Sequence, residues 1–190
     1  EFLYRNNFSK VPLMEKLCFS REMNKDLAEK ARNTDIIHTH GLWIMPSIYS
    51  GKISLSLGVP HVISPRGMLS PEALKFSRVR KGVIWKVAQH EYLQKAKCLH
   101  ATSDEEYLDI RRLGFKNPVA VIPNGVPINP LSPGPKDLGK KKALLFLGRR
   151  HPIKGLDLLI ASWARLDKRF PDWKLVLVGP SEGRYDDILK

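Results

Sequence analysis

The stretch LFLGRRHPIKGLDLLI, Leu145 to Ile160, decides how the second half of the chain folds. An apolar run over Ala143–Leu147 predicts a strand that ends at Gly148, and Gly155 opens an amphipathic helix. The cations between the two glycines are Arg149, Arg150, His151 and Lys154. Free backbone N–H groups and the helix dipole point at the same spot, where arginine adds a planar fork and lysine a point charge. The junction therefore predicts a diphosphate site, and the alternative is a solvated basic loop.

Four further stretches place glycines, prolines or polar residues at the ends of short apolar runs. They are DIIHTHGLW (Asp35 to Trp43), HVISPRGMLSP (His61 to Pro71), VIPNGV (Val121 to Val126) and LVLVGPSEG (Leu175 to Gly183). In this order, and with helices between them, the five stretches resemble the family 4 glycosyltransferases, retaining enzymes of the GT-B fold. The resemblance runs from about Asp35 to the end of the sequence. It implies parts of two Rossmann-like domains, one for the acceptor and one for a nucleotide-sugar donor.

Strand and helix signals alternate along the whole sequence. The expected strands are Asp35–Thr39, His61–Ser64, Cys98–Ala101, Val119–Ile122, Ala143–Leu147 and Lys174–Val178. The expected helices are Glu15–Arg32, Ser47–Leu57, Val79–Lys95, the segment from Ser103 to Gly114, Gly155–Arg169 and Tyr185–Leu189. Pro46 and Gly58 are expected to mark the start and the end of the second helix, and Ser103 with Glu106 is expected to form a capping box. The third helix is expected to hold Val79, Val83, Ile84 and Val87 on one face. The helix after Gly155 is expected to bury Leu156, Leu159, Ile160, Trp163 and Leu166. Such alternation favours an α/β fold in which parallel sheets carry helices.

A break in composition separates two regions. Residues 123–135 hold five prolines and two glycines, and a lysine run follows. We therefore expect 1–126 to be the C-terminal part of the acceptor-side domain, 127–142 an interdomain linker, and 143–190 the N-terminal part of the donor-binding domain. The alternative for 127–142 is a long surface loop. Compared with the family, the sequence lacks the first glycine loop and the C-terminal Glu motif, which predicts a fragment truncated at both ends.

The chain has 190 residues, with 32 basic and 19 acidic side chains and a net charge of +13. Such a charge favours anionic partners: nucleic acid, anionic lipid or phosphorylated substrates. No basic arm interleaved with aromatic residues is present, so we expect no nucleic acid. No apolar run reaches the roughly 20 residues that span a bilayer. The sequence does not open on a basic and then apolar stretch, so we expect no signal peptide. Cys18 and Cys98 lack metal-site spacing, and this cysteine usage fits a reducing cytoplasm.

Candidate residues on the acceptor side lie where expected strands end. His38 and His40 are two apart, so both point to one face of their strand. The resemblance implies that His40 is the catalytic residue, because the family often places a histidine near the reacting sugar there. The alternative is a histidine whose polar atoms are satisfied within the core or a loop. Arg66 and Gly67 follow the next strand and could meet an acceptor or line the cleft. Asn124 and its glycine neighbour predict a turn with positive φ near the cleft.

Candidate residues on the donor side carry over from the same resemblance. Arg149 and Lys154 match the family's grip on the donor diphosphate, with Gly148 and Gly155 framing them. Gly179 and Gly183 match the loop near the nucleotide. Fixed cations would stabilise the charge that grows on the leaving diphosphate, and in the family they replace a divalent metal. No metal and no other cofactor are therefore expected.

The resulting prediction is a hexosyltransferase-type glycosyltransferase that transfers a sugar, with retention, from a nucleotide-diphosphate sugar to an acceptor hydroxyl. The expected partners are the nucleotide sugar and a glycan or lipid-linked acceptor from cell-envelope polysaccharide or lipopolysaccharide biosynthesis. The expected location is the cytoplasm, including peripheral contact with anionic membrane at its inner face. By themselves, the 190 residues are expected to be marginally stable and inactive. The alternatives are a non-catalytic basic module that binds nucleic acid or membrane, and another GT-B-like enzyme such as a sugar-nucleotide epimerase.

Overall fold

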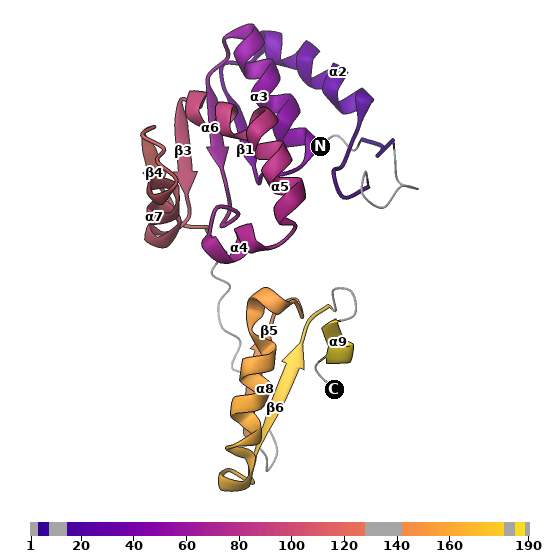
Figure 1. Ribbon diagram of the computed structural model, residues 1–190, viewed down its shortest axis with the longest axis vertical. Helices are drawn as coiled ribbons and strands as arrows, with labels where there is room; N and C mark the ends of the chain where they lie inside the picture. Colours follow the sequence, from indigo (N-terminus) through magenta and orange to yellow (C-terminus); the bar gives the residue numbers. More distant parts are fainter. Residues whose placement is uncertain (1–3, 8–14, 128–141, 181–184, 189–190) are drawn as a thin grey trace. The chain divides into compact units, whose positions relative to one another are not determined.

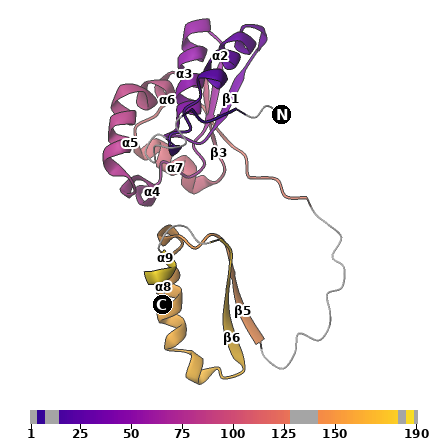
Figure 2. The same ribbon diagram turned by 90° about the vertical axis from the view of Figure 1, so that its right-hand side faces the viewer.

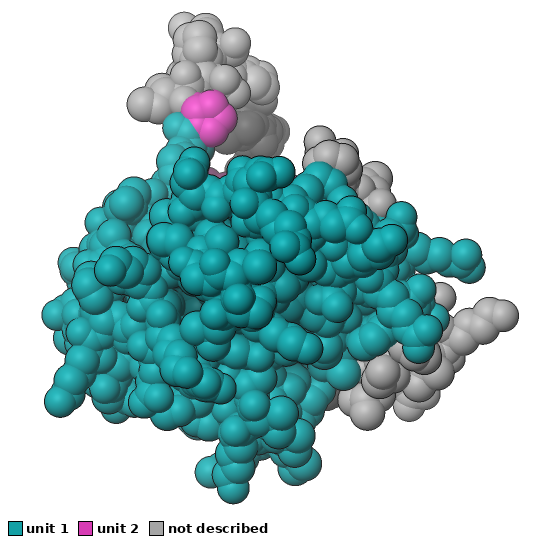
Figure 3. Space-filling view, turned by 90° about the horizontal axis from the view of Figure 1, so that it is seen from above, with its two compact units in different colours: residues 1–126 teal, residues 127–190 magenta. Residues whose placement is uncertain are grey.

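The computed structural model describes residues 4–7, 15–127, 142–180 and 185–188 (Figure 1). The chain divides into two compact units, Glu1–Val126 and Pro127–Lys190, each with its own sheet (Figures 2 and 3). Residues 128–141, nearly all of the expected linker, lie outside the described residues.

The first unit is built on a four-stranded sheet. Its strands are β1 (Ile37–His40), β2 (His61–Ser64), β3 (Cys98–Ala101) and β4 (Val119–Val121). They lie in the order β1-β2-β3-β4, and each pair of neighbours is parallel. All their carboxyl ends therefore meet at one edge of the sheet, which is where open α/β sheets place ligands. The predicted α/β class with parallel sheets is confirmed.

Helices connect the strands of this unit. They are α2 (Arg21–Lys30), the 3-10 turn η1 (Ala31–Asn33), α3 (Met45–Leu57), α4 (Pro71–Lys75), α5 (Arg78–Ile84), the π-helical turn η2 (Trp85–Gln89), α6 (His90–Lys95) and α7 (Asp104–Arg112). Local sequence explains several of their ends. Ser20 and Ser103 cap the first turns of α2 and α7 with their hydroxyls, and Pro46 stands in the first turn of α3. Gly58 ends α3 in the left-handed conformation, as predicted.

The two faces of this sheet differ in character. Ile37, Ile63 and Leu99 are buried. Ile63 and Leu99 pack in one hydrophobic cluster with side chains of α6 and α7, and Ile37 packs in a second cluster with side chains of α3. Successive strand residues point to opposite faces, so His38, His40 and His100 lie on the other face. The sheet thus separates an apolar core from a row of histidines.

The first helix is shorter than the sequence predicts. The expected helix Glu15–Arg32 is interrupted. Glu15 is helical, residues 16–18 form a turn, α2 begins at Arg21, and a 3-10 turn follows Lys30. The Ser20 hydroxyl accepts from Met23 N, 3.2 Å away, and this cap fixes the start of α2.

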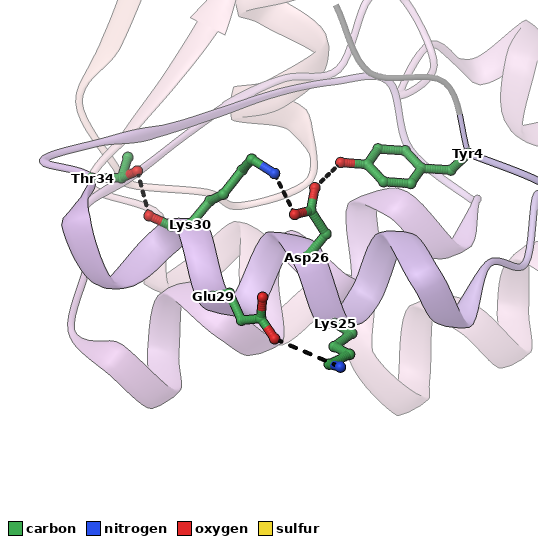
Figure 4. A network of polar contacts seen from close by, with 6 residues as sticks. All are labelled: Tyr4, Lys25, Asp26, Glu29, Lys30 and Thr34. Atoms are coloured by element: carbon green, nitrogen blue, oxygen red, sulfur yellow. Dashed lines mark hydrogen bonds and ion pairs between the residues drawn. The ribbon is translucent and has the colours of Figure 1, made fainter.

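Polar contacts link α2 to the segments before and after it (Figure 4). The Asp26 carboxylate accepts from the Tyr4 hydroxyl and from the Lys30 ammonium. The hydrogen bond to Asp26 is the main cause that raises the pKa of Tyr4 to about 12. The Thr34 hydroxyl donates to the Lys30 carbonyl at 2.9 Å, which links the end of α2 to the segment that leads into β1.

The long helical segment before β3 corrects a second expectation. Val79, Val83, Ile84 and Val87 were expected on one face of the helix, yet only Ile84 packs against the core. The three valines are 84%, 58% and 76% exposed. The inner side of the segment is occupied by Trp85, Ala88, Gln89 and Leu93 instead.

The second unit is small. Its elements are β5 (Lys142–Leu147), the 3-10 turn η3 (Pro152–Lys154), α8 (Leu156–Ala164), the 3-10 turn η4 (Asp167–Arg169), β6 (Trp173–Val178) and α9 (Tyr185–Ile188). Strands β5 and β6 pair in parallel. Of the expected inner face of α8, Leu156 is fully buried, whereas Leu159, Ile160 and Trp163 are partly buried. Leu166 is exposed, contrary to expectation, because α8 has already ended at Ala164.

Both cysteines are free thiols. Cys18 is exposed, and Cys98 is only partly buried, on the histidine face of β3. Within the described ranges, no helix is long and apolar enough to cross a membrane.

Candidate functional site

Arg66 joins the predicted acceptor-side residues into one cluster. Its guanidinium contacts His40 Nδ1 through Nε at 3.2 Å and through Nη2 at 2.9 Å, while Nη1 donates to the Asn124 side-chain oxygen. The three residues follow, or end, strands β1, β2 and β4. The structure therefore brings together three side chains that lie up to 84 positions apart in the chain.

The contact with Arg66 also defines the state of His40. Because Nδ1 accepts from the guanidinium, a neutral imidazole carries its proton on Nε2. Burial, followed by the positive charges of Arg66 and His100, lowers the pKa of His40. His40 is therefore a neutral hydrogen-bond donor at physiological pH. Its Nε2 has no hydrogen-bond partner in the part of the chain that the structure describes.

The loop that carries Arg66 has an unusual backbone. Arg66 and Gly67 are both left-handed, with φ of 57° and 72°. A Cβ added to Gly67 would meet no atom within 4 Å. Glycine therefore suits this position because it adopts a positive φ easily, not because another atom lies too close for a side chain. The backbone N–H of Gly67 already donates a hydrogen bond to Glu106 Oε1 at 2.7 Å, so it is not available to bind an acceptor substrate.

Glu106 holds this loop in place, a role that the sequence did not indicate. Its carboxylate is 3% exposed and also accepts from the backbone N–H and the hydroxyl of Thr102, at 2.7 and 2.8 Å. The sequence suggested only a capping box between Ser103 and Glu106. The Ser103 half of that motif is present, with Ser103 Oγ accepting from Glu106 N. The carboxylate instead joins the end of β3 to the Arg66 loop.

A row of hydrogen bonds crosses the histidine face of the sheet. His100 Nε2 lies 2.9 Å from the Ile122 carbonyl, to which it can only donate. In neutral His100, Nδ1 therefore accepts from the Ser64 hydroxyl at 2.7 Å, and Ser64 Oγ accepts from His38 Nε2 at 2.8 Å. The partners thus fix the tautomers of His38 and His100.

This row ends beside the Arg66 cluster. The rings of His38 and His40 lie 4.3 Å apart, and burial, His40, His100 and Arg66 together lower the pKa of His38. His100 and Ser64 were not predicted as site residues. Strand alternation combined with the register of β1, β2 and β3 would have placed them on this face.

The expected turn at Asn124 is not formed. Neither Asn124 nor Gly125 has a positive φ, and residues 122–127 belong to no helix or strand. The bond from Arg66 holds the Asn124 side chain in this segment. The prediction of a positive-φ turn was therefore wrong.

In the second unit, two loops at the carboxyl ends of β5 and β6 are joined through their backbones. Gly148 N donates to the Val178 carbonyl, and Arg150 N donates to the Pro180 carbonyl, both at 2.9 Å. At Gly179, where φ is 143°, an added Cβ would lie 1.9 Å from the Gly148 carbonyl oxygen. The Gly179 contact thus requires glycine. Gly183, also predicted near the nucleotide, lies outside the described residues.

The loop then turns into α8 through a short 3-10 helix. His151 Nδ1 accepts from Ile153 N at 3.2 Å and so caps η3. Gly155 is left-handed, with φ of 63°, and precedes the first residue of α8. Arg149 and Lys154 are exposed on this loop, beside a helix start whose first N–H groups lack helical partners.

Within the described ranges, no three His, Cys, Asp or Glu residues form a group that could hold a metal ion.

Comparisons with known proteins agree with this architecture. The glycosyl transferase 4-like domain matches residues 9–125, and the glycosyl transferases group 1 domain matches residues 132–190. The chain is 26% identical to D-inositol 3-phosphate glycosyltransferase 2 of Catenulispora acidiphila, across 77% of the chain and 38% of that protein. It is 27% identical to D-inositol 3-phosphate glycosyltransferase of Kribbella flavida, across 91% of the chain and 45% of that protein.

Solved structures show the same fold. HepE of Anabaena, in complex with UDP, matches with a TM-score of 0.66 and 22% identity over 87% of the chain and 45% of HepE. Sucrose-phosphate synthase of Thermosynechococcus elongatus matches with a TM-score of 0.57 and 20% identity over 90% of the chain and 48% of that enzyme. The chain thus spans less than half the length of these relatives. Because the first domain alone covers well over half of the chain, the protein belongs to the glycosyltransferases of the GT-B fold.

Proposed function

We propose that the whole protein transfers a hexosyl group from a nucleotide-diphosphate sugar to an acceptor hydroxyl with retention of configuration. The observation that carries this proposal is the loop from Gly148 to Gly155. It presents Arg149 and Lys154 at the carboxyl end of β5, beside the start of α8. Such a site suits a diphosphate, and the UDP bound to HepE supports this class of ligand.

The chemistry requires charge stabilisation on the donor side. When the sugar–phosphate bond breaks, the electron pair stays with the nucleotide diphosphate, whose negative charge grows. Arg149 and Lys154 would stabilise that charge, which is why the proposed reaction requires no metal. Gly179 would keep the β6 loop close enough to Gly148 for both loops to approach the nucleotide.

The cluster of the first unit suits the acceptor side. His40 offers Nε2–H as a neutral donor to a sugar or acceptor oxygen. Arg66 holds His40 in that tautomer and adds a positive charge for an acceptor phosphate or carboxylate. Gly67 and Asn124 would act indirectly, by setting the position of Arg66.

Nucleotide binding provides the direct test. Each charge-assisted contact to a diphosphate contributes roughly 1.5–3 kcal/mol, so Arg149→Ala and Lys154→Ala should each weaken UDP binding by about ten- to a hundredfold. Calorimetry with the whole protein measures this, and Arg165→Ala, an exposed cation after α8, serves as the matched control. Wild-type affinity for UDP in both loop variants would contradict the proposal that Arg149 and Lys154 bind the diphosphate.

The acceptor and the location complete the proposal. We place the reaction in cell-envelope polysaccharide or lipopolysaccharide assembly, with a glycan or lipid-linked acceptor. The net charge of +13 supports peripheral contact with the anionic inner face of a membrane, reached from the cytoplasm. Proton NMR of the product, read while it forms, tests retention at the anomeric carbon.

A further inference from the structure

The outward side of the helical segment from α5 to η2 is apolar. Val79, Val83 and Val87 recur every four residues and are 84%, 58% and 76% exposed. Phe76, just before α5, is 39% exposed. The inward side already packs on the core, so these side chains are not needed there.

The same segment is strongly cationic. Residues 73–90 contain five lysines or arginines and no aspartate or glutamate. Lys75, Arg78 and Lys86 are exposed beside the valines. A stripe of apolar side chains within an acid-free basic segment is typical of surfaces that lie in the headgroup region of anionic bilayers.

A groove next to the stripe has the same mixed character. It has a volume of about 320 Å³ and is lined by Trp43, Leu74, Arg78, Lys81, Gly82, Trp85 and Leu113. Arg78 and Gly82 line the groove and directly precede Val79 and Val83 of the stripe, so the groove adjoins the stripe along α5. Tryptophan and cations around an apolar hollow suit a molecule with a negatively charged head and a hydrocarbon part.

We infer that this face, defined by Phe76, Val79, Val83 and Val87 with Lys75, Arg78 and Lys86, docks the protein on an anionic lipid bilayer. Charge complementarity favours an anionic bilayer, because each of the three exposed cations directly precedes an apolar residue of this face in the chain. This inference deepens the proposed function, since it names the surface for the proposed membrane contact. It can still be tested without any sugar transfer.

The first experiment is flotation of the whole protein with vesicles. Vesicles of phosphatidylcholine with 30% phosphatidylglycerol would be compared with vesicles of phosphatidylcholine alone. Removing the three cations (Lys75→Gln, Arg78→Gln and Lys86→Gln together) should lower partitioning onto the anionic vesicles by about a hundredfold, at about fivefold for each cation. A control variant with the same loss of charge on another surface (Lys16→Gln, Arg21→Gln and Lys25→Gln together) should show a clearly smaller decrease in partitioning onto the anionic vesicles.

The second variant tests the apolar stripe. Replacing the three valines together by glutamine should lower partitioning by roughly tenfold or more, because their side chains no longer enter the headgroup region. Leu158→Gln, at a 71% exposed leucine of the second unit, is the matched control. Glutamine favours helices, so α5 is expected to remain folded.

Hydrogen exchange distinguishes the bilayer from other occupants. Peptides across 76–90 should be protected only when anionic vesicles are present. Protection without vesicles would mean that another part of the protein, or a second copy, covers the face, and the inference would be wrong. Equal partitioning of all variants would also overturn it. UDP affinity, measured in parallel, separates this failure from failure of the proposed function.

Discussion

Replacing Glu106 with glutamine should release the loop that carries Arg66. The carboxylate is 3% exposed and accepts three hydrogen bonds, from Gly67 N and from the N–H and hydroxyl of Thr102. A glutamine can keep its oxygen towards Thr102, but its NH₂ group then faces the Gly67 N–H, and two donors oppose each other. The most important loss is therefore the bond to Gly67.

The expected magnitude follows from these contacts. A hydrogen bond to a charged group contributes about 1.5–3 kcal/mol, and the two remaining bonds weaken when the acceptor becomes neutral. The left-handed conformation of Arg66 already costs about 1–2 kcal/mol in the wild type, so a loop without its tether can relax away from it. We expect Glu106→Gln to lower the free energy of unfolding of the first unit by about 2–4 kcal/mol.

Two measurements on the whole protein check this reasoning. Hydrogen exchange should accelerate in peptides that contain Gly67, and urea unfolding should shift to lower concentration. If Arg66 moves away from His40, the pKa of His40 should rise towards its ordinary value, which NMR titration of the imidazole would record. Glu105→Gln, the exposed neighbour in α7, is the control. Identical exchange and stability in the two variants would refute the tether.

Three further outcomes are expected. Burial lowers the pKa of His61 to about 4, so the folded state favours the neutral ring. The resulting contribution to the free energy of unfolding, up to about 3 kcal/mol, is fully present above pH 6.5 and is lost as the pH falls towards 4. Urea unfolding at pH 7 and 4.5 should show this loss in the wild type and less of it in His61→Gln, and equal losses would contradict the assignment. Gly179→Ala should destabilise the second unit by more than about 2 kcal/mol in thermal unfolding, because its Cβ would meet the Gly148 carbonyl, whereas Gly125→Ala, in open space, should change little. Finally, transfer by the whole protein should persist in EDTA; complete loss that Mg²⁺ or Mn²⁺ restores would point to a metal-dependent mechanism.

Strong local patterns were enough to predict several elements. The strands His61–Ser64 and Cys98–Ala101 have their expected bounds, because short runs of strand-forming residues stand between clear turn signals. Helix α3 begins and ends close to the residues that Pro46 and Gly58 indicate. Caps and turns act over a few residues, and such effects are visible in one sequence.

The remaining features depend on contacts across the fold. The valines of α5 and η2 have helical spacing, but periodicity cannot say which side of a helix meets the core. Glu106 looked like a cap because its partner Gly67 lies 39 positions away in the chain. The prediction named His40, Arg66 and Asn124 separately. The parallel register of the strands brings the three residues to one edge of the sheet, where Arg66 contacts both of the others.

The backbone bonds between the β5 and β6 loops have a consequence for the timing of ligand binding. Because the backbone N–H groups of Gly148 and Arg150 donate hydrogen bonds to Val178 and Pro180, the start of the cationic loop extends the pairing of β5 with β6. The backbone of this loop is thus ordered during folding, before any anion arrives. A diphosphate would then meet a preorganised site and would lose little affinity to the ordering of the loop. Association should accordingly be fast and governed by ionic strength, with no slow closing step on the β5 side.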